Sequence, residues 1–204
     1  MQEQEKQTAK GRDLYEWVQS LVGSVLVVVA IFTFVIRMMG VDGHSMLNTL
    51  QHGDRLLVVN SMLYHDYKYG DIVILRKNGV FDDDPIVKRV IAVEGQTVDI
   101  DFAEGIVYVD GAALDEDYVN EPTHKSYLEY GMGLDYPVEV PEGSVFVMGD
   151  NRNESADSRV APVGCVPESQ ISGRVLLIVV PGSQTDKQGN ITGGRVWRRI
   201  GAVA

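Results

Sequence analysis

The sequence predicts a mostly β domain, built from folded antiparallel sheets or a partial barrel, behind one N-terminal transmembrane helix. Three observations support this fold class. Residues 21–36 form an uncharged apolar run, short apolar segments separated by turn residues follow it, and no amphipathic helix of convincing length interrupts them. The length of 204 residues suits one such domain with small additions and leaves little room for two.

The apolar run is long enough to cross a membrane. With Trp17 and Val18 it covers residues 17–36, and about 20 helical residues match the hydrocarbon core of a bilayer. A buried helix and a cleaved signal peptide are the alternatives. The run exceeds the usual apolar core of a signal peptide, and residues 37–40 offer no small-x-small cleavage site. We therefore expect a tail at 1–16, a retained anchor at 17–37 and a domain at 38–204.

Charges near the anchor predict its orientation. Lys6, Lys10 and Arg12 precede the run and Arg37 closely follows it, so we expect a cytoplasmic N-terminus and a domain on the outer face of the cell membrane. Residues 1–37 carry four basic and four acidic side chains, so the whole net charge of −11 lies in residues 38–204. A phosphate backbone would repel such a domain, and we expect no nucleic-acid partner.

The predicted strands lie between turn signals such as His52-Gly53-Asp54 and Asp110-Gly111. They cover residues 55–59, 71–75, 86–93, 97–101, 106–109, 144–148 and 171–180. Residues 110–143, rich in Asp, Glu, Tyr and Gly, are expected to be an excursion between strands, and residues 182–190 a loop. The basic and aromatic end at 195–200 is interpreted as a last strand or a mobile terminus, with a contact to anionic lipid head groups as an alternative.

No metal or cofactor site is predicted. The four histidines and Cys165 lack metal-ligand spacing, the acidic run 82–84 lacks the spaced ligands of a calcium loop, and there is no Gly-rich phosphate loop. The single cysteine cannot form an intramolecular disulfide and is expected to be a packed thiol.

A serine and a lysine are the candidate catalytic residues. Ser45 follows the anchor closely, and its hydroxyl needs a base to become a nucleophile. Lys88 shares one face of the predicted strand 86–93 with Ile86 and Val90, which is an apolar setting for an ammonium. Desolvation lowers a lysine pKa by up to several units, so a neutral Lys88 amine can accept the serine proton. A capping serine and a snorkelling lysine are the alternatives.

A polar stretch at residues 149–159 follows the apolar residues 145–148 directly. Such a density of acids, basic residues and hydroxyls is suited to fixing a catalytic serine and lysine in place, although a solvated loop has the same composition.

Together these stretches resemble the type I signal peptidase family, the membrane-anchored serine peptidases that remove signal peptides from exported preproteins. The last of the matching blocks is the most specific, and the short anchor and excursion resemble the compact Gram-positive form. In chain order the blocks are Gly43-x-Ser45-Met46 with Thr49-Leu50, Gly53-Asp54, Tyr69-Gly70-Asp71-Ile72-Val73, Lys88-Arg89-Val90-Ile91 with Gly95, and Gly149-Asp150-Asn151-Arg152 with Ser155 and Asp157-Ser158-Arg159.

The resemblance implies that Ser45 is the nucleophile and Lys88 the general base, a Ser-Lys variant of the catalytic triad. Ser155 is expected to orient the lysine amine. A supporting network is expected from Asp150 and from an ion pair between Asp157 and Arg159. Backbone N–H groups of Ser45 and Gly43 are expected to form the oxyanion hole. Asn48 stands where many members have Pro, which puts the stiffness of this loop in doubt.

The expected activity is cleavage of exported preproteins after a small-x-small motif. Preproteins and the lipid bilayer are the expected partners, with no cofactor and no required protein partner. A self-cleaving repressor protease is an alternative, but it needs a DNA-binding helical domain for which the chain has no place. A membrane-tethered binding module, in which residues 149–159 are only a solvated surface, is the other.

Overall fold

The computed structural model describes residues 2–77, 79–80, 84–186, 188 and 190–203, with side chains from residue 15 onward. Asp82 and Asp83, from the acidic run considered as a calcium loop, lie outside the described residues. The chain divides into two compact units, residues 1–37 and 38–204.

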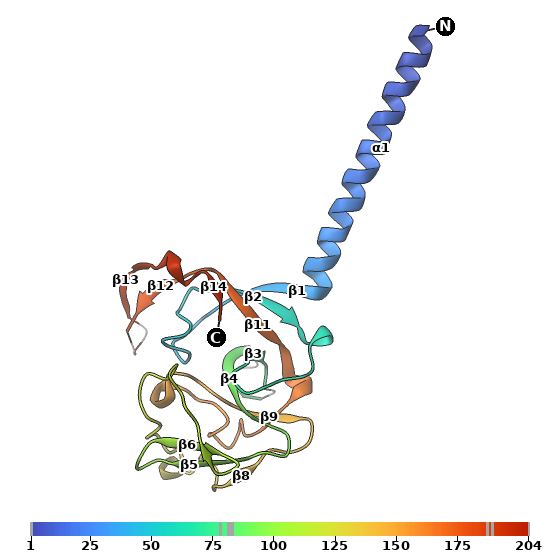
Figure 1. Ribbon diagram of the computed structural model, residues 1–204. Coiled ribbons are helices and arrows are strands. Elements are labelled where there is room, and N and C mark those ends of the chain that lie inside the picture. Colours follow the sequence, from blue (N-terminus) through green and yellow to red (C-terminus); the bar gives the residue numbers. More distant parts are fainter. Residues whose placement is uncertain (1, 78, 81–83, 187, 189, 204) are drawn as a thin grey trace. The chain divides into compact units, whose positions relative to one another are not determined.

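The first unit is one helix. Helix α1 covers Gln2–Ala30, and the π-helical turn η1 at Ile31–Val35 continues it (Figure 1). The span Tyr15–Val35 has a mean hydropathy of 2.4 and no buried part, so it is long and apolar enough to cross a membrane. Its exposure argues against the core helix of a soluble protein. The helix begins well before residue 17, so the residues expected to form a tail are helical as well.

An eight-stranded sheet frames the second unit, with the order β1-β2-β11-β3-β4-β9-β10 and β14 pairing with β11. Its described pairings are antiparallel. The sheet curls into a half-barrel, which confirms the predicted mostly β class (Figure 1). Its strands are β1 Ile36–Gly40, β2 Arg55–Asn60, β3 Ile72–Leu75, β4 Ile86–Val93, β9 Ser144–Met148, β10 Val166–Pro167, β11 Ile171–Val180 and β14 Gly201–Ala202.

A four-stranded sheet, with the order β7-β6-β5-β8, forms the other end of this unit. It contains β5 Thr97–Asp101, β6 Ile106–Val109, β7 Ala112–Ala113 and β8 Val138–Glu139. The last two come from the excursion at residues 110–143, which is therefore folded onto the β5–β6 hairpin. Short 3₁₀ turns connect the elements: η2 Ser61–Leu63, η4 Leu128–Tyr130, η5 Arg152–Glu154, η6 Glu168–Gln170 and η7 Trp197–Arg199.

The prediction of a loop at residues 182–190 is wrong in part. Strands β12 Ser183–Thr185 and β13 Ile191–Arg195 form a two-stranded hairpin in which Thr185 pairs with Ile191. Polar strands as short as these carry no apolar alternation, so sequence patterns do not reveal them.

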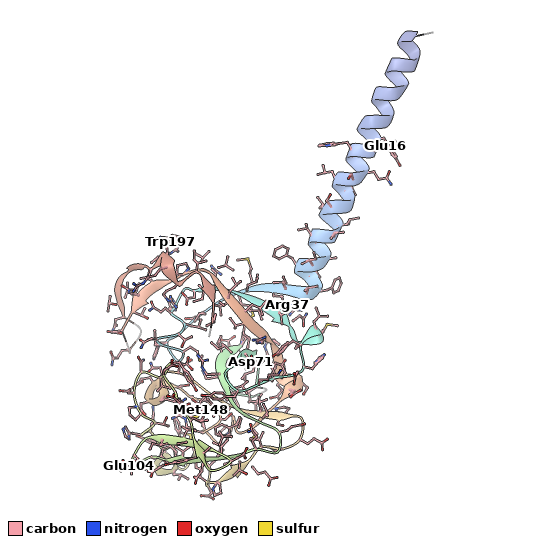
Figure 2. The ribbon with its side chains drawn as sticks, viewed as in Figure 1. Glu16, Arg37, Asp71, Glu104, Met148 and Trp197 are labelled. Carbon is pink, nitrogen blue, oxygen red and sulfur yellow. The ribbon has the colours of Figure 1, made fainter. Side chains whose placement is uncertain are left out.

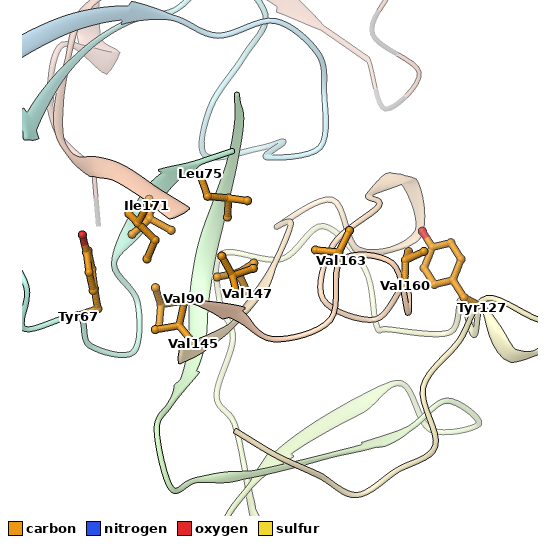
Figure 3. Close-up of a cluster of buried hydrophobic side chains, with 11 residues drawn as sticks. Tyr67, Leu75, Val90, Tyr127, Val145, Val147, Val160, Val163 and Ile171 are labelled. Atoms are coloured by element: carbon orange, nitrogen blue, oxygen red, sulfur yellow. The ribbon is translucent and has the colours of Figure 1, made fainter. Parts of the chain in front are cut away.

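The apolar core has three clusters, and β4 contributes to all of them. Val90 belongs to the cluster of Figure 3, Val87 packs beside the second, and Ile91 and Ala92 belong to the third. A register shift against β9 between Val90 and Ala92 breaks the strict alternation of the strand there. Cys165 packs beside the third cluster, as expected of a packed thiol.

The basic C-terminal end is hydrogen-bonded to the rest of the second unit. Arg199 donates to both carboxylate oxygens of the buried Asp54, at 2.9 and 2.8 Å, and to the carbonyl oxygen of Thr49 at 2.9 Å. This part of the chain is therefore neither a mobile terminus nor, at Arg199, a strand. The neighbouring Trp197 lies at the rim of the unit and is 59% exposed, whereas Met148 at the end of β9 lies in its interior (Figure 2).

Gly173 marks a close approach of β11 to β2. A Cβ atom at this position would lie 2.3 Å from the carbonyl oxygen of Val59 and 2.8 Å from Cγ1 of Val58. We expect Gly173→Ala to lower the free energy of unfolding of the full chain by about 1–3 kcal/mol, measured by chemical denaturation in detergent. Gly194→Ala in β13 is the matched control, since nothing lies within 4 Å of its Cβ position. Equal stability of the two variants would contradict the close packing.

Candidate active site

Ser45 lies in the turn that joins β1 to β2, and both sides of this turn are fixed. On the apolar side, Met46 and Leu50 are buried in the second core cluster. On the polar side, Asn151 donates from its backbone N–H to the carbonyl oxygen of Ser45 at 3.0 Å and from Nδ2 to that of His44 at 3.1 Å. The polar loop at 149–159 therefore sets the position of the Ser45 backbone directly.

Lys88 extends from β4 to the Ser45 hydroxyl. Its Nζ lies 2.7 Å from Oγ of Ser45 and donates a second hydrogen bond to the carbonyl oxygen of Val87 at 3.0 Å. The side chain is 3% exposed, so it does not snorkel to solvent. Burial lowers the pKa of Lys88 to about 8, although the charges of Asp157 and Asp150 oppose this shift. A 2.7 Å separation is short enough for direct proton transfer to a neutral amine.

Asp157 and Arg159 form a buried ion pair in the polar loop. Arg159 donates from Nε and Nη2 to the two carboxylate oxygens at 2.8 and 2.9 Å, and Gly149 donates its backbone N–H to Oδ2 of Asp157 at 2.9 Å. Burial alone would raise the pKa of Asp157, but Arg159, assisted by the Gly149 N–H and Lys88, lowers it overall. The carboxylate therefore stays ionised beside Lys88.

A second buried ion pair joins β4 to the polar loop. Arg89 donates from Nε and Nη2 to the carboxylate of Asp150 at 2.9 and 2.8 Å, and from Nη1 to the carbonyl oxygen of Gly70 at 3.0 Å. Thr49 also donates its hydroxyl to Asp150. Sequence reasoning assigned no role to Arg89 or Thr49. An arginine inside an apolar strand was the available signal, because a buried guanidinium requires a carboxylate partner.

Gly149 allows the polar loop to approach Ser45 closely. A Cβ atom at this position would lie 2.1 Å from Oγ of Ser155 and 2.5 Å from the carbonyl oxygen of Ser45. A side chain here would displace either the serine backbone or the loop, so the loop can approach Ser45 only with glycine at this position.

Ser155 does not make the contact expected of it. Its Oγ is buried and forms no hydrogen bond with any of the described residues, while the Lys88 amine is bonded to Ser45 and Val87. The hydroxyl lies in the loop beside the position that a Gly149 side chain would take, but in this structure it does not orient the amine.

Gly43 also differs from its expected role. Its φ angle of +107° favours glycine, and its N–H donates to Nδ1 of His52 at 3.3 Å rather than pointing toward an empty oxyanion position. His52 Nδ1 is also 3.2 Å from the carboxylate of Asp42. The Gly43 N–H has to leave this imidazole before it can bind an oxyanion.

A cavity of about 280 Å³ lies next to the serine and the lysine. Ser45 and Lys88 line it together with side chains that are mostly apolar, among them Val41, Met46, Leu56, Ile74 and Val87. This volume is at the lower end of the range for small-molecule pockets and suits small apolar groups. A serine hydroxyl, a buried lysine amine and a mostly apolar cavity thus occupy one place.

Comparison with known proteins identifies the relatives of this chain. A sequence model of the family described as "Signal peptidase, peptidase S26" matches residues 14–180. The chain is 40% identical to the probable signal peptidase I-1 of Synechocystis over 74% of this chain and 75% of that protein. It is 35% identical to the signal peptidase I of Bacillus licheniformis over 90% of this chain and 98% of that one. A crystal structure of a signal peptidase I from Enterococcus faecalis matches 53% of this chain and 96% of that chain, with 28% identity and a TM-score of 0.41.

The Asp157–Arg159 pair predicts a stability effect that depends on pH. Asp157→Asn leaves a guanidinium that is 1% exposed without its counter-charge, so the free energy of unfolding at pH 7 should fall by about 3–5 kcal/mol. Because the pKa of Asp157 is lowered in the folded chain, its stabilisation is present above about pH 4 and is lost as the pH falls through the lowered pKa. Chemical denaturation of the wild type and of Asp157→Asn, at pH 7 and below about pH 4, measures the effect.

Asp66→Asn is the control for this prediction, because Asp66 pairs with Lys68 at the surface, where the two side chains are 84% and 67% exposed. Its loss should change the free energy of unfolding by no more than about 0.5 kcal/mol. An Asp157→Asn variant as stable as this control would show that the buried pair is not required.

Proposed function

The chain belongs to the signal peptidase I family, peptidase S26, a family of serine endopeptidases, and on this premise we propose that Ser45 and Lys88 are the catalytic dyad with which it cleaves signal peptides from preproteins. The observation that carries the proposal is the 2.7 Å separation of a buried lysine amine from a serine hydroxyl at the edge of an apolar cavity. A solvated binding surface would not require a desolvated base at this position.

The reaction follows from the positions of these groups. Neutral Lys88 takes the proton of Ser45 while Oγ attacks the scissile carbonyl carbon. The ammonium then protonates the leaving amine, and the C–N bond breaks to leave an acyl-enzyme on Ser45. Lys88 next removes a proton from water, which attacks the ester, and returns that proton to Oγ as the new carboxyl group leaves.

The tetrahedral intermediates need hydrogen-bond donors. We assign this role to the backbone N–H of Ser45 and to that of Gly43, which must exchange His52 for the oxyanion. Each such donor is worth roughly 2.7–4 kcal/mol in comparable enzymes. The Arg89–Asp150 and Asp157–Arg159 pairs support the dyad by fixing β4 and the polar loop. Ser155 keeps a proposed role in orienting the amine only if its hydroxyl turns toward Lys88 during the reaction.

The cavity supports a preference for small side chains. Residues before the scissile bond would bind as an extended strand beside the domain and place small groups in the space lined by Val41, Leu56 and Ile74. This fits the small-x-small pattern at the end of signal peptides.

The N-terminal helix supports a membrane location. We propose that it is a retained single-pass anchor with Lys6, Lys10 and Arg12 on the cytoplasmic side and residues 38–204 on the outer face. The partners are then preproteins and the bilayer, without nucleic acid, a cofactor or a required protein partner.

Substitution of the dyad tests the function. Ser45→Ala and Lys88→Ala should each reduce cleavage of a model preprotein by roughly 10⁴-fold or more in detergent or lipid, with the fold retained. Lys88→Arg should be equally inactive, because a guanidinium keeps its proton at these pH values. The rate of preprotein processing, measured by gel under single-turnover conditions, gives the result. Asp66→Asn, at the surface, is the matched control, and substantial activity in either alanine variant would overturn the dyad.

The lowered pKa of Lys88 predicts the pH profile. Only the neutral amine acts as a base, so kcat/KM should rise about tenfold per pH unit at acid pH and level off above about pH 8. A His44→Asn variant, which lacks the imidazole next to Ser45 in the sequence, is the control, and its acid limb should keep the same midpoint. A flat profile between about pH 6 and 9 is incompatible with a lysine base.

A further inference from the structure

Three segments that are distant in the sequence supply the proposed catalytic groups: the Ser45 turn, β4 and the polar loop at 149–159. Residues 116–120, which belong to the excursion, contact all three. Asn120 donates from Nδ2 to the carbonyl oxygen of Leu47 at 3.2 Å, and the ring of Tyr118 lies 3.9 Å from the guanidinium carbon of Arg89. Glu116 accepts hydrogen bonds from both terminal nitrogens of Arg152, with Nη1 at 2.7 Å.

Tyr118 lies close to two buried cations. The guanidinium carbon of Arg152 is 6.0 Å from the ring centre, so both arginines are within cation–π distance of the same ring. The hydroxyl of Tyr118 donates to Oε1 of Glu116 at 2.8 Å and lies 3.1 Å from that of Tyr69. Burial and the Glu116 charge raise the pKa of Tyr118, so the phenol stays a neutral donor.

Both arginines need their partners because neither is exposed to water. Arg89 is 2% and Arg152 is 1% exposed, and they are neutralised by Asp150 and Glu116 respectively. Arg89 is the residue after Lys88, and Arg152 is in the loop that positions the Ser45 backbone. Both guanidinium groups therefore belong to residues that directly follow one in contact with Ser45: Arg89 follows Lys88, and Arg152 follows Asn151.

The 116–120 segment is attached by polar contacts. The three apolar clusters of the described core take Leu114, Tyr127, Leu134, Tyr136, Val138 and Val140 from the excursion, but no residue from 116–120. The rest of the excursion thus accounts for its apolar packing, while this segment contacts the neighbours of the catalytic groups.

We propose that residues 116–120 are a positioning element that holds the Ser45 turn, β4 and the polar loop in fixed positions relative to one another. Tyr118 is its central positioning residue, and Glu116 and Asn120 are its two ends. The proposal rests on the proposed function, since it assigns a purpose to contacts around that dyad. None of these three side chains is assigned a contact with substrate.

Substitution of Tyr118 separates the ring from the hydroxyl. Tyr118→Phe keeps the aromatic face for both arginines and should retain kcat within about threefold. Tyr118→Leu keeps apolar bulk but loses that face, so kcat should fall about 10- to 100-fold while KM stays within about twofold. Water that enters beside Arg89 should also hydrate Lys88 and so raise its lowered pKa. The acid limb of the pH profile should then move to higher pH. Full-chain enzyme in detergent and one model preprotein provide all of these measurements.

Two further variants keep the test decisive if Tyr118→Leu does not fold. Asn120→Ala removes the hydrogen bond that this segment donates to Leu47 in the Ser45 turn, and it should lower kcat about three- to tenfold with KM unchanged. Asp117→Ala is the matched control, because this exposed side chain lies between Glu116 and Tyr118 in the same segment, and it should behave as wild type.

The outcomes distinguish this proposal from the proposed function. If wild type and Ser45→Ala both fail to cleave, the proposed function is wrong. If wild type cleaves and folded Tyr118→Leu and Asn120→Ala match it in kcat and in the pH profile, positioning by residues 116–120 is wrong. A rise in KM with unchanged kcat would overturn it too, because that result indicates contact with substrate.

Discussion

Burial of the Lys88 amine against the hydroxyl of Ser45, which lowers the pKa of the lysine to about 8, is the constraint on which the rest of the domain depends. Desolvation supplies the shift, so the amine must be enclosed by β4, the Ser45 turn and the core clusters on either side of the strand. Enclosure also has to leave the hydroxyl open to a cavity. The half-barrel meets both demands because its curled sheet buries residues 88–92 of β4 while Ser45 lines the cavity.

A polar loop beside a desolvated base creates a conflict. The carboxylates of Asp150 and Asp157 both favour the charged form of Lys88, yet both are needed to fix the loop. Each carboxylate is paired with a guanidinium, Arg89 or Arg159, and the Arg159 charge opposes protonation of the lysine. The loop is therefore hydrogen-bonded and carries two carboxylates, while the pKa of Lys88 still stays lowered to about 8.

The sequence was informative wherever one strand carried its own pattern. The apolar content and flanking turns of residues 86–93 and 171–180 were enough to predict β4 and β11 at their observed bounds. Patterns failed where an element depends on its partner: β12, β13 and the two-residue strands of the excursion exist only through pairing.

The same limit applies to the candidate active site. Ser45 and Lys88 were predicted from local features and resemblance, but the Arg89–Asp150 pair, the Gly43–His52 bond and the absence of a Ser155–Lys88 bond depend on distances between remote residues.

Arg199 connects the Ser45 turn to a remote part of the chain. It holds Asp54 and the carbonyl oxygen of Thr49, and β11 supplies the pairing edge of β2, so residues distant in the sequence fix the Ser45 turn. The hydrogen bond from Arg199 to Thr49 joins residues that are 150 positions apart. Local unfolding at Trp197–Arg199 would therefore loosen the turn although these residues make no direct contact with Ser45 or Lys88.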